Sequence, residues 1–188
     1  LSNKRELAVQ TTNGMMHLRT GEDGRVLANL GAPVFEPADI PFTVTAHSLE
    51  YTLDAGNETY QVGALSMGNP HVVLQVPSCN DAPVASLGPL IECHERFPER
   101  VNVGFMEVCS RTEIKLRVFE RGAGETQACG TGACAAAVHG MRMGLLDNAV
   151  TVQLPGGKLS VSWAGDNEPV WLGGPTATVF EGAIRLRP

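Results

Sequence analysis

The sequence predicts an α/β protein of the α+β type, in which a curved β-sheet wraps around one central, buried helix. Two observations carry this prediction. Short segments of alternating polarity, separated by turn-forming residues, dominate the 188-residue chain. The segment Gly130–Met143 is instead rich in alanine and carries no acidic or basic charge before Arg142. Because a helix that is apolar nearly all round is usually buried, we expect this one to lie inside the sheet.

The first thirty residues predict three strands. These are Glu6–Thr11, Met15–Thr20 and Arg25–Leu30, separated by Thr-Asn-Gly and Gly-Glu-Asp-Gly turns. The proline-containing stretch Gly31–Pro41 follows and is the best candidate for a domain boundary. The chain begins at Leu1 and enters a strand almost at once, so we expect a preceding part of this domain to be missing.

The rest of the chain predicts more strands and one further helix. Asp81-Ala82-Pro83 is typical of a helix start with Asp81 as its cap, and the helix is expected to reach about Phe97 despite Gly88-Pro89 inside it. The further predicted strands are Phe42–Ala46, Leu49–Leu53, Thr59–Leu65, His71–Val76, Val101–Val108, Glu113–Glu120, Val150–Leu154, Lys158–Trp163, Val170–Leu172 and Thr176–Phe180.

Composition and charge exclude several classes of protein. The net charge is −6 and no run of Lys or Arg stands out, which argues against a nucleic-acid partner. No stretch approaches the roughly 20 apolar residues that span a bilayer, so no membrane partner is expected. The five cysteines are odd in number and do not suggest a disulfide framework. Reduced thiols in a cytoplasmic protein are the simplest interpretation.

The segment from Glu120 to Cys134, ERGAGETQACGTGAC, carries the chemistry. Cys129 stands just before the buried helix, where free amide groups and the helix dipole are expected to lower the pKa of its thiol. The amides of Gly130 and Thr131 are available to bind a carboxylate. A thiolate beside a carboxylate-binding turn suits proton abstraction next to a carboxylate, as in amino-acid racemisation.

Other interpretations of this segment compete. A lone cysteine at a helix start is often only a small buried side chain. Gly130–Ala135 fits the dinucleotide pattern G-x-G-x-x-A with Asp147 downstream, but that pattern requires a strand directly before its first glycine, which GAGETQAC does not predict. Cys93-His94, Cys129 and Cys134 are conceivable metal ligands, yet no C-x-x-C pair occurs, so no metal is expected.

The segment resembles the second cysteine motif of the diaminopimelate epimerases. Further segments match that family in the same order: MGNPHVV at Met67–Val73, LIECHERFPE at Leu90–Glu99, and FPERVNVGF at Phe97–Phe105. The resemblance implies two pseudo-symmetric domains, each with a curved mixed sheet around a central helix. It also implies one catalytic cysteine per domain, acting on opposite faces of the substrate α-carbon without pyridoxal phosphate, metal or any other cofactor.

By the same resemblance, Cys129 is the second catalytic cysteine, and Gly130 and Thr131 bind the reacting carboxylate. The distal end of the substrate would be held by Asn69, Asn102, Glu120 and Arg121. His71 and Glu120 are expected to tune Cys129, although His71 also fits an ordinary core histidine. The implied reaction interconverts LL- and meso-2,6-diaminopimelate for lysine and peptidoglycan precursors, and the implied assembly is a possible homodimer.

The family's first cysteine motif, a Cys-Gly-Asn-Gly-Ala-Arg-type segment, does not occur in residues 1–188. We therefore expect residues 1–30 to be the end of an N-terminal domain, 31–174 to be the C-terminal domain, and 175–188 to be a strand returning to the first domain. The chain alone is expected to be inactive. The alternatives are a proline racemase-like enzyme, whose small substrates need no distal clamp, or a non-catalytic fragment that binds carboxylates. Cys129 argues against the related phenazine-biosynthesis type.

Overall fold

The computed structural model describes residues 4–11, 14–21 and 24–185. Within them, 12 strands form one sheet in the order β1-β2-β3-β12-β11-β10-β8-β7-β6-β5-β4, with β9 added on β8. The pairs β6–β7 and β8–β10 are parallel and the others are antiparallel. The strands are β1 (Glu6–Thr11), β2 (Gly14–Thr20), β3 (Val26–Asn29), β4 (Tyr51–Ala55), β5 (Glu58–Ser66), β6 (Pro70–Gln75), β7 (Asn102–Ser110), β8 (Glu113–Glu120), β9 (Gly124–Thr126), β10 (Ala149–Leu154), β11 (Gly157–Ser162) and β12 (Trp171–Gly174).

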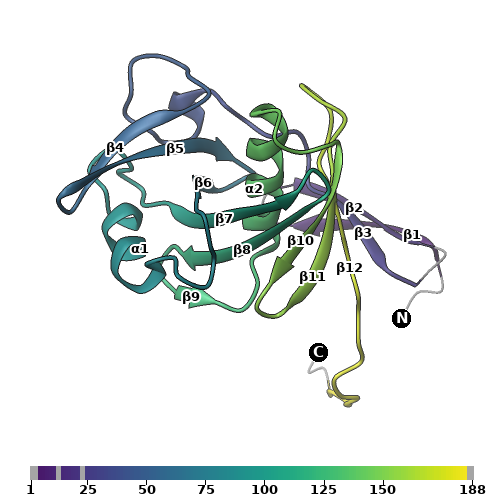
Figure 1. Ribbon diagram of the computed structural model, residues 1–188. Helices are drawn as coiled ribbons and strands as arrows, with labels where there is room; N and C mark the ends of the chain where they lie inside the picture. The colour runs from purple at the N-terminus through teal and green to yellow at the C-terminus, as the bar shows by residue number, and fades with distance from the viewer. Residues whose placement is uncertain (1–3, 12–13, 22–23, 186–188) are drawn as a thin grey trace.

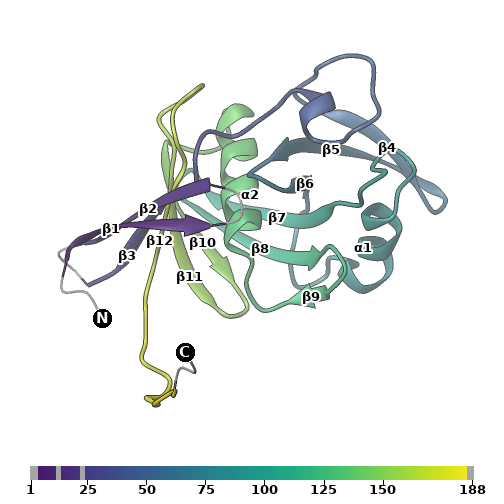
Figure 2. The same cartoon turned by 180° about the vertical axis from the view of Figure 1, so that it is seen from behind.

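The sheet curls around the helix α2 (Gly130–Arg142). The helix contacts the strands β5 to β8 in one half of the sheet and β10 to β12 in the other. Figure 1 shows α2 between the strands β5 to β8 on one side and β10 to β12 on the other, and Figure 2 shows the same arrangement from behind. Ala133 and the run Ala135–Ala137 are fully buried. Their small side chains let strands approach the helix from several directions. The predicted curved mixed sheet around a buried helix is therefore confirmed.

A second apolar cluster lies on the other face of the sheet, under the helix α1 (Val84–Glu92) and the hairpin β4–β5. Phe42 belongs to it, with its ring stacked on Phe97 at 4.4 Å between centroids and edge-on to Tyr51 at 4.8 Å. A short 3₁₀ turn, η1 (Pro37–Asp39), delivers the chain to this cluster, and the Phe42 amide donates to the Pro37 carbonyl. The ring packing explains why the predicted strand Phe42–Ala46 does not form.

Three other local predictions were wrong. The helix α1 begins at Val84 after Pro83, not after Asp81, and it ends at Glu92, well before Phe97. The Leu87 amide donates to the Pro83 carbonyl, which makes Pro83 the cap. The strand β9 forms although it was not predicted. The segment Thr176–Phe180 is not a strand. Its Val179 and Phe180 side chains are 89% and 84% exposed, so no neighbouring strand supports it.

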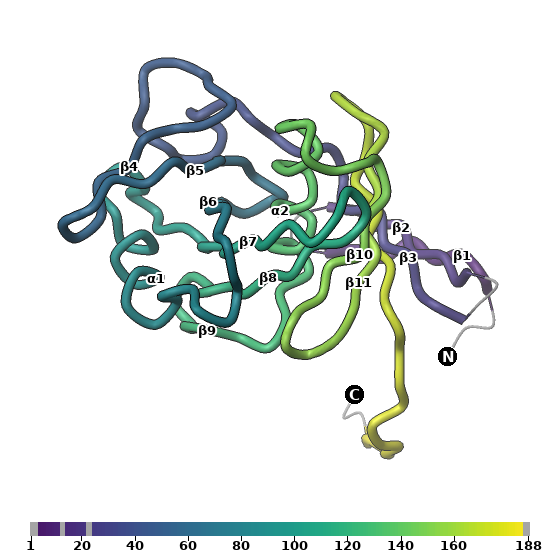
Figure 3. Tube along the Cα trace, viewed as in Figure 1, coloured from purple at the N-terminus to yellow at the C-terminus, as the bar shows by residue number. Residues whose placement is uncertain are grey.

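The first three strands were predicted, and β1, β2 and β3 form a meander that joins the sheet where β3 pairs with β12. The turns expected at Thr12-Asn13 and Glu22-Asp23 lie outside the described residues. Figure 3 shows the chain after β12 leaving the sheet as an extended segment. The division into 1–30, 31–174 and 175–188 stays a prediction. No helix of the described ranges is long and apolar enough to cross a membrane.

Two buried histidines should make the fold sensitive to acid. Burial lowers the pKa of His71 from 6.5 to about 3 and that of His139 to about 4, with nearby arginine charges adding to the effect. The unfolded chain therefore binds protons before the folded chain does. Their contribution to stability is complete above about pH 6.5 and is lost as the pH falls toward 3.

We expect the free energy of unfolding to fall by about 2 kcal/mol between pH 6 and pH 5, since each histidine contributes roughly 1 kcal/mol per pH unit there. Urea denaturation at the two pH values measures this difference. His139→Gln should reduce the slope by about half, and His47→Gln, at an exposed position, should leave it unchanged. Equal slopes in the wild type and His139→Gln would contradict the assignment.

Candidate active site

The predicted site residues gather at one edge of the sheet. The parallel strands β6 and β7 begin there, with His71 opposite Asn102, and the antiparallel neighbour β8 ends there at Glu120. The short strand β9 turns back along β8 from this edge, and the first turn of α2 lies against β8, where a β-carbon at Gly132 would be 3.2 Å from Val118. The fold thus brings together residues as far apart in the sequence as Asn69 and Thr131.

Asn102 connects three of these segments. It is buried, and its side-chain amide donates to the Pro70 carbonyl at 2.9 Å. Its side-chain oxygen accepts the backbone amide of Arg121 at 3.0 Å. Asn102 therefore ties the start of β6 to the turn after β8. The sequence predicted a substrate contact for Asn102, and the contacts in the structure show that it also builds the edge on which the site stands.

The turn after β8 presents Arg121 to solvent. The Ala123 amide donates back to the Glu120 carbonyl, and Gly122 has a φ of 74°, which glycine adopts at little cost. The Gly122 amide donates to the Glu92 carboxylate at 2.7 Å. The Arg121 guanidinium donates to the Glu99 carbonyl at 3.0 Å through one nitrogen. The remaining donors of this exposed guanidinium are available for a carboxylate.

Cys129 lies at the start of α2 and is 5% exposed. Its carbonyl accepts the Ala133 amide, so Gly130 and Thr131 lie in the first turn, where amides have no carbonyl of the same helix to bind. Its sulfur is 3.7 Å from the Thr131 hydroxyl. A β-carbon added at Gly132 would be 3.2 Å from that sulfur, so a larger residue there would require the sulfur to move by a few tenths of an ångström.

The pKa of Cys129 differs from the prediction. Burial raises the pKa of the thiol above its ordinary value, and the nearby Glu120 carboxylate raises it further. The Gly132 amide and the Thr131 hydroxyl act in the opposite direction without overcoming burial. The expected lowering by the helix start is therefore wrong for this chain, because desolvation of the thiolate outweighs the amides. In this state Cys129 is a thiol at neutral pH, suited to donating a proton.

This correction reverses an expected order of chemical labelling. The low pKa expected from the sequence would make Cys129 react with iodoacetamide faster than Cys79 or Cys109. The structure instead buries Cys129 and leaves Cys93 and Cys109 exposed. We expect Cys93 and Cys109 in the 188-residue chain to be alkylated at least about tenfold faster than Cys129 near pH 7.5. Peptide mapping by mass spectrometry gives the three rates, and an equal or faster rate at Cys129 would contradict the burial of its sulfur.

His71 was predicted to tune Cys129. It is fully buried, and its Nε2 atom lies 3.0 Å from the side-chain oxygen of Asn69. With its pKa lowered to about 3, the ring is neutral at ordinary pH and can donate one hydrogen bond to Asn69. The contact in the structure is thus with Asn69, which it orients at the start of β6. A direct effect of His71 on Cys129 stays a prediction.

Two residues of this edge were not predicted as site residues. Thr126 donates to the Glu120 carboxylate from β9, and Glu92 holds the Gly122 amide from the end of α1. Both stand in segments that resemble the family's motifs, but a sequence shows neither the pairing of β9 with β8 nor the approach of α1 to the turn. The sequence feature that could have pointed to Glu92 is its position in LIECHERFPE, a segment that resembles the family and contains the end of α1.

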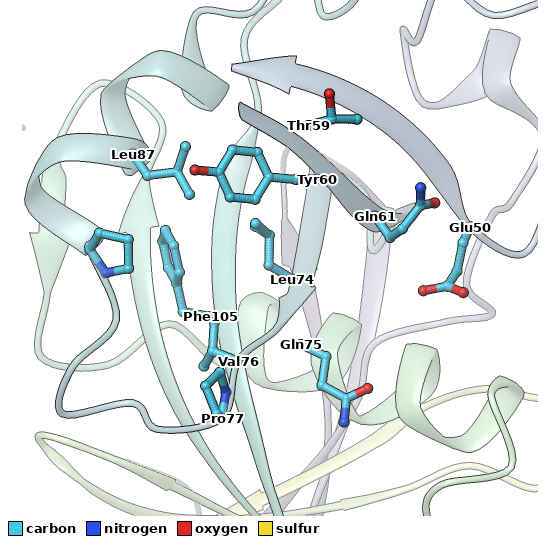
Figure 4. Close-up of a pocket in the computed structure, with 11 residues that line it drawn as sticks. Glu50, Thr59, Tyr60, Gln61, Leu74, Gln75, Val76, Pro77, Leu87 and Phe105 are labelled. Carbon is cyan, nitrogen blue, oxygen red and sulfur yellow. The ribbon is translucent and has the colours of Figure 1, made fainter. Parts of the chain in front are cut away.

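A hollow of about 600 Å³ lies elsewhere, between α1 and the strands β5 to β7. Figure 4 shows Tyr60, Leu74, Leu87 and Phe105 around it, and Cys129 is not among its lining residues. No group of three His, Cys, Asp or Glu side chains in the described ranges is arranged to hold a metal ion. Three residues separate the end of β9 at Thr126 from the start of α2 at Gly130, and β9 runs antiparallel to β8, unlike the strand of a dinucleotide-binding unit.

The fold is shared with a solved structure described as a probable proline racemase from Agrobacterium radiobacter K84. The two superpose with a TM-score of 0.68 at 16% sequence identity, over 100% of this chain and 63% of the other. The curved sheet wrapped around a buried helix is thus a fold that the chain shares with this solved structure.

Sequence comparison gives the particular family. The family model described as diaminopimelate epimerase matches residues 63–178. A diaminopimelate epimerase of Alkalilimnicola ehrlichii is 56% identical over 97% of this chain and 66% of its own length, and one of Ectopseudomonas mendocina is 53% identical over 99% and 67%. The chain belongs to the diaminopimelate epimerase family, and it spans about two thirds of the length of these curated relatives.

Proposed function

We propose that this chain carries one half of the active site of an isomerase that interconverts LL- and meso-2,6-diaminopimelate. The single observation that carries the proposal is the edge of the sheet where Asn102, Glu120 and Arg121 meet the cysteine at the start of α2, in a chain of this family. The proposed cellular role is the supply of lysine and peptidoglycan precursors.

In the proposed reaction, a thiolate on one face of the substrate removes the α-proton, and a thiol on the other face returns a proton to the same carbon. Cys129 is one of these two groups. The free amides of Gly130 and Thr131 stabilise the charge that develops on the adjacent carboxylate. With its raised pKa, Cys129 starts as the thiol donor, and it becomes the base in the reverse direction.

The distal amino acid of the substrate is proposed to bind at the start of β6 and β7. Arg121 can hold its carboxylate through two parallel hydrogen bonds, while Asn69 and Asn102 supply amide groups nearby. Glu120 directly precedes Arg121, and its backbone carbonyl can accept a hydrogen bond from the distal ammonium group. This set of polar groups fits a long substrate with a second polar end and favours diaminopimelate over the small ring of proline.

A chimera tests the proposal. The N-terminal part of the Alkalilimnicola ehrlichii relative, which by the family resemblance holds the first cysteine, is fused before Leu1. We expect the chimera to epimerise LL-diaminopimelate with a kcat in the ordinary enzymatic range of about 1–1000 per second. The 188 residues alone are expected to give no turnover, because the second face of the substrate lacks its acid–base group.

L-Proline serves as the competing substrate in the same assay. Preference for proline, or a folded chimera that turns over neither compound, would contradict the proposed activity. A chimera that only binds diaminopimelate in calorimetric titration would favour the non-catalytic alternative. Diaminopimelate as the small-molecule partner, the possible homodimer and the cytoplasmic location are parts of the same proposal, and sedimentation analysis of the chimera measures its assembly.

A further inference from the structure

Glu120 needs a partner that fixes its carboxylate. It stands half-buried at the end of β8, one residue before the turn that presents Arg121. A glutamate side chain has three rotatable bonds, and at a strand end it is free to turn toward solvent unless something holds it. The hydrogen bond that the structure gives to its Oε1 atom comes from the Thr126 hydroxyl.

The strand pairing explains why Thr126 reaches this carboxylate. In the β8–β9 register, Val118 lies opposite Thr126 and Glu120 lies opposite Gly124. Glu120 and Thr126 are therefore diagonal neighbours on one face of the two strands, a spacing that long side chains span. Gly124, directly opposite Glu120, has no side chain to occupy the space between them. Thr126 is also β-branched, so its hydroxyl has few rotamers from which to choose.

We propose that Thr126 is a positioning residue, whose hydroxyl holds the Glu120 carboxylate toward the sulfur of Cys129. Thr126 lies three residues before Cys129 on the same segment, so one short stretch of chain supplies both the sulfur and the group that aims its neighbour. Val118, two residues before Glu120 on the same face of β8, packs in one apolar cluster with Cys129, and the Glu120 carboxylate raises the pKa of the Cys129 thiol. This role deepens the function proposed above, on which its catalytic consequence rests.

The test is a titration of Cys129 in the 188-residue chain, by the pH dependence of its alkylation with iodoacetamide, read by peptide mapping. Thr126→Val keeps the side-chain shape and removes the hydroxyl. The freed carboxylate turns away, so the midpoint at Cys129 should move down by about one pH unit. Thr126→Ser keeps the hydroxyl and should titrate within about 0.2 pH units of the wild type, which a merely structural role of the threonine methyl would not produce.

Glu120→Gln and Thr126→Val together form a double-mutant cycle. Glu120→Gln should lower the midpoint as Thr126→Val does, and Thr126→Val added to Glu120→Gln should cause no further shift. An unchanged midpoint in Thr126→Val, an upward shift, an equal shift in Thr126→Ser, or a full additional shift in the double variant would each overturn the proposal. Circular dichroism of each variant verifies that it is folded, and Thr126→Ala, which also lacks the hydroxyl, replaces Thr126→Val if that variant does not fold.

The pH–rate profile of the chimera gives a separate readout. The limb of this profile that reflects the pKa of Cys129 should shift along the pH axis in Thr126→Val, by the same amount and in the same direction as the alkylation midpoint. Because the titration requires no turnover, the role of Thr126 and the proposed activity can be contradicted independently of each other. An inactive chimera with an intact titration cycle would overturn the proposed activity alone, and an active chimera without the cycle would overturn only the role of Thr126.

Discussion

Cys129→Ser in the chimera is expected to lower kcat for diaminopimelate epimerisation by at least about a thousandfold. General acid–base catalysis by a positioned side chain contributes roughly 100- to 10,000-fold, and serine fills nearly the same space with a hydroxyl that is a far weaker acid than a thiol. The affinity for meso-diaminopimelate should change little, because the carboxylate donors are backbone amides. A coupled assay of epimerisation, with calorimetric titration of the substrate, measures both quantities.

Cys109→Ser is the matched control, since Cys109 is exposed on β7 and contacts Glu107 rather than the proposed site. It should retain near wild-type activity. A Cys129→Ser chimera within tenfold of the wild-type rate would show that Cys129 does not transfer the proton. Loss of activity accompanied by loss of the folded circular dichroism signal would instead call for Cys129→Ala at lower temperature, with the same expected loss of rate.

Gly63→Ala is expected to destabilise the fold by about 3 kcal/mol, at the upper end of the usual cost of overpacking. A β-carbon at Gly63 would lie 2.3 Å from Nδ1 of His139, far inside contact distance. The His139 ring is 5% exposed, and it stands on α2, which the sheet surrounds, so it has little room to retreat. For a chain of this size, the melting temperature should fall by roughly 6–12 °C.

Gly104→Ala tests the same change without the clash, because its new β-carbon would meet Leu116 at an ordinary 3.4 Å. It should alter the free energy of unfolding by less than about 1 kcal/mol. Adding His139→Ala to Gly63→Ala should recover part of the loss, since the ring that obstructs the methyl group is gone. If Gly63→Ala proves as stable as Gly104→Ala, the result would contradict the close approach of His139 on α2 to Gly63 on β5.

The parts of the fold that follow from local pattern were predictable. The alanine-rich segment identified α2 to within one residue, and the alternation in Glu113–Glu120 gave β8 with the same bounds. Where the structure depends on contacts between distant segments, the pattern was insufficient. Phe42 alternates as a strand residue would, but stacking on Phe97 decides its conformation. The segment Thr176–Phe180 alternates too, and it has no adjacent strand to pair with in the described ranges.

The candidate site divides in the same way. The motif around Cys129 indicated the residue types, and the structure adds how Asn102 connects the start of β6 to Arg121. The direction in which the pKa of Cys129 shifts was not predictable. It depends on whether burial or the helix amides dominate, and burial is a property of the folded chain. The contact of Thr126 with Glu120 was equally unpredictable from the sequence, because the hydroxyl reaches Glu120 only through the pairing of β9 with β8.

A crystal structure of the chimera with meso-diaminopimelate bound tests the central claim most directly. We expect one α-carbon of the substrate within about 3.5 Å of the Cys129 sulfur, as proton transfer requires, with its carboxylate on the amides of Gly130 and Thr131. The other carboxylate should lie on the Arg121 guanidinium. A substrate bound away from Cys129, or bound with neither carboxylate on these groups, would contradict the assignment of this sheet edge as the active site.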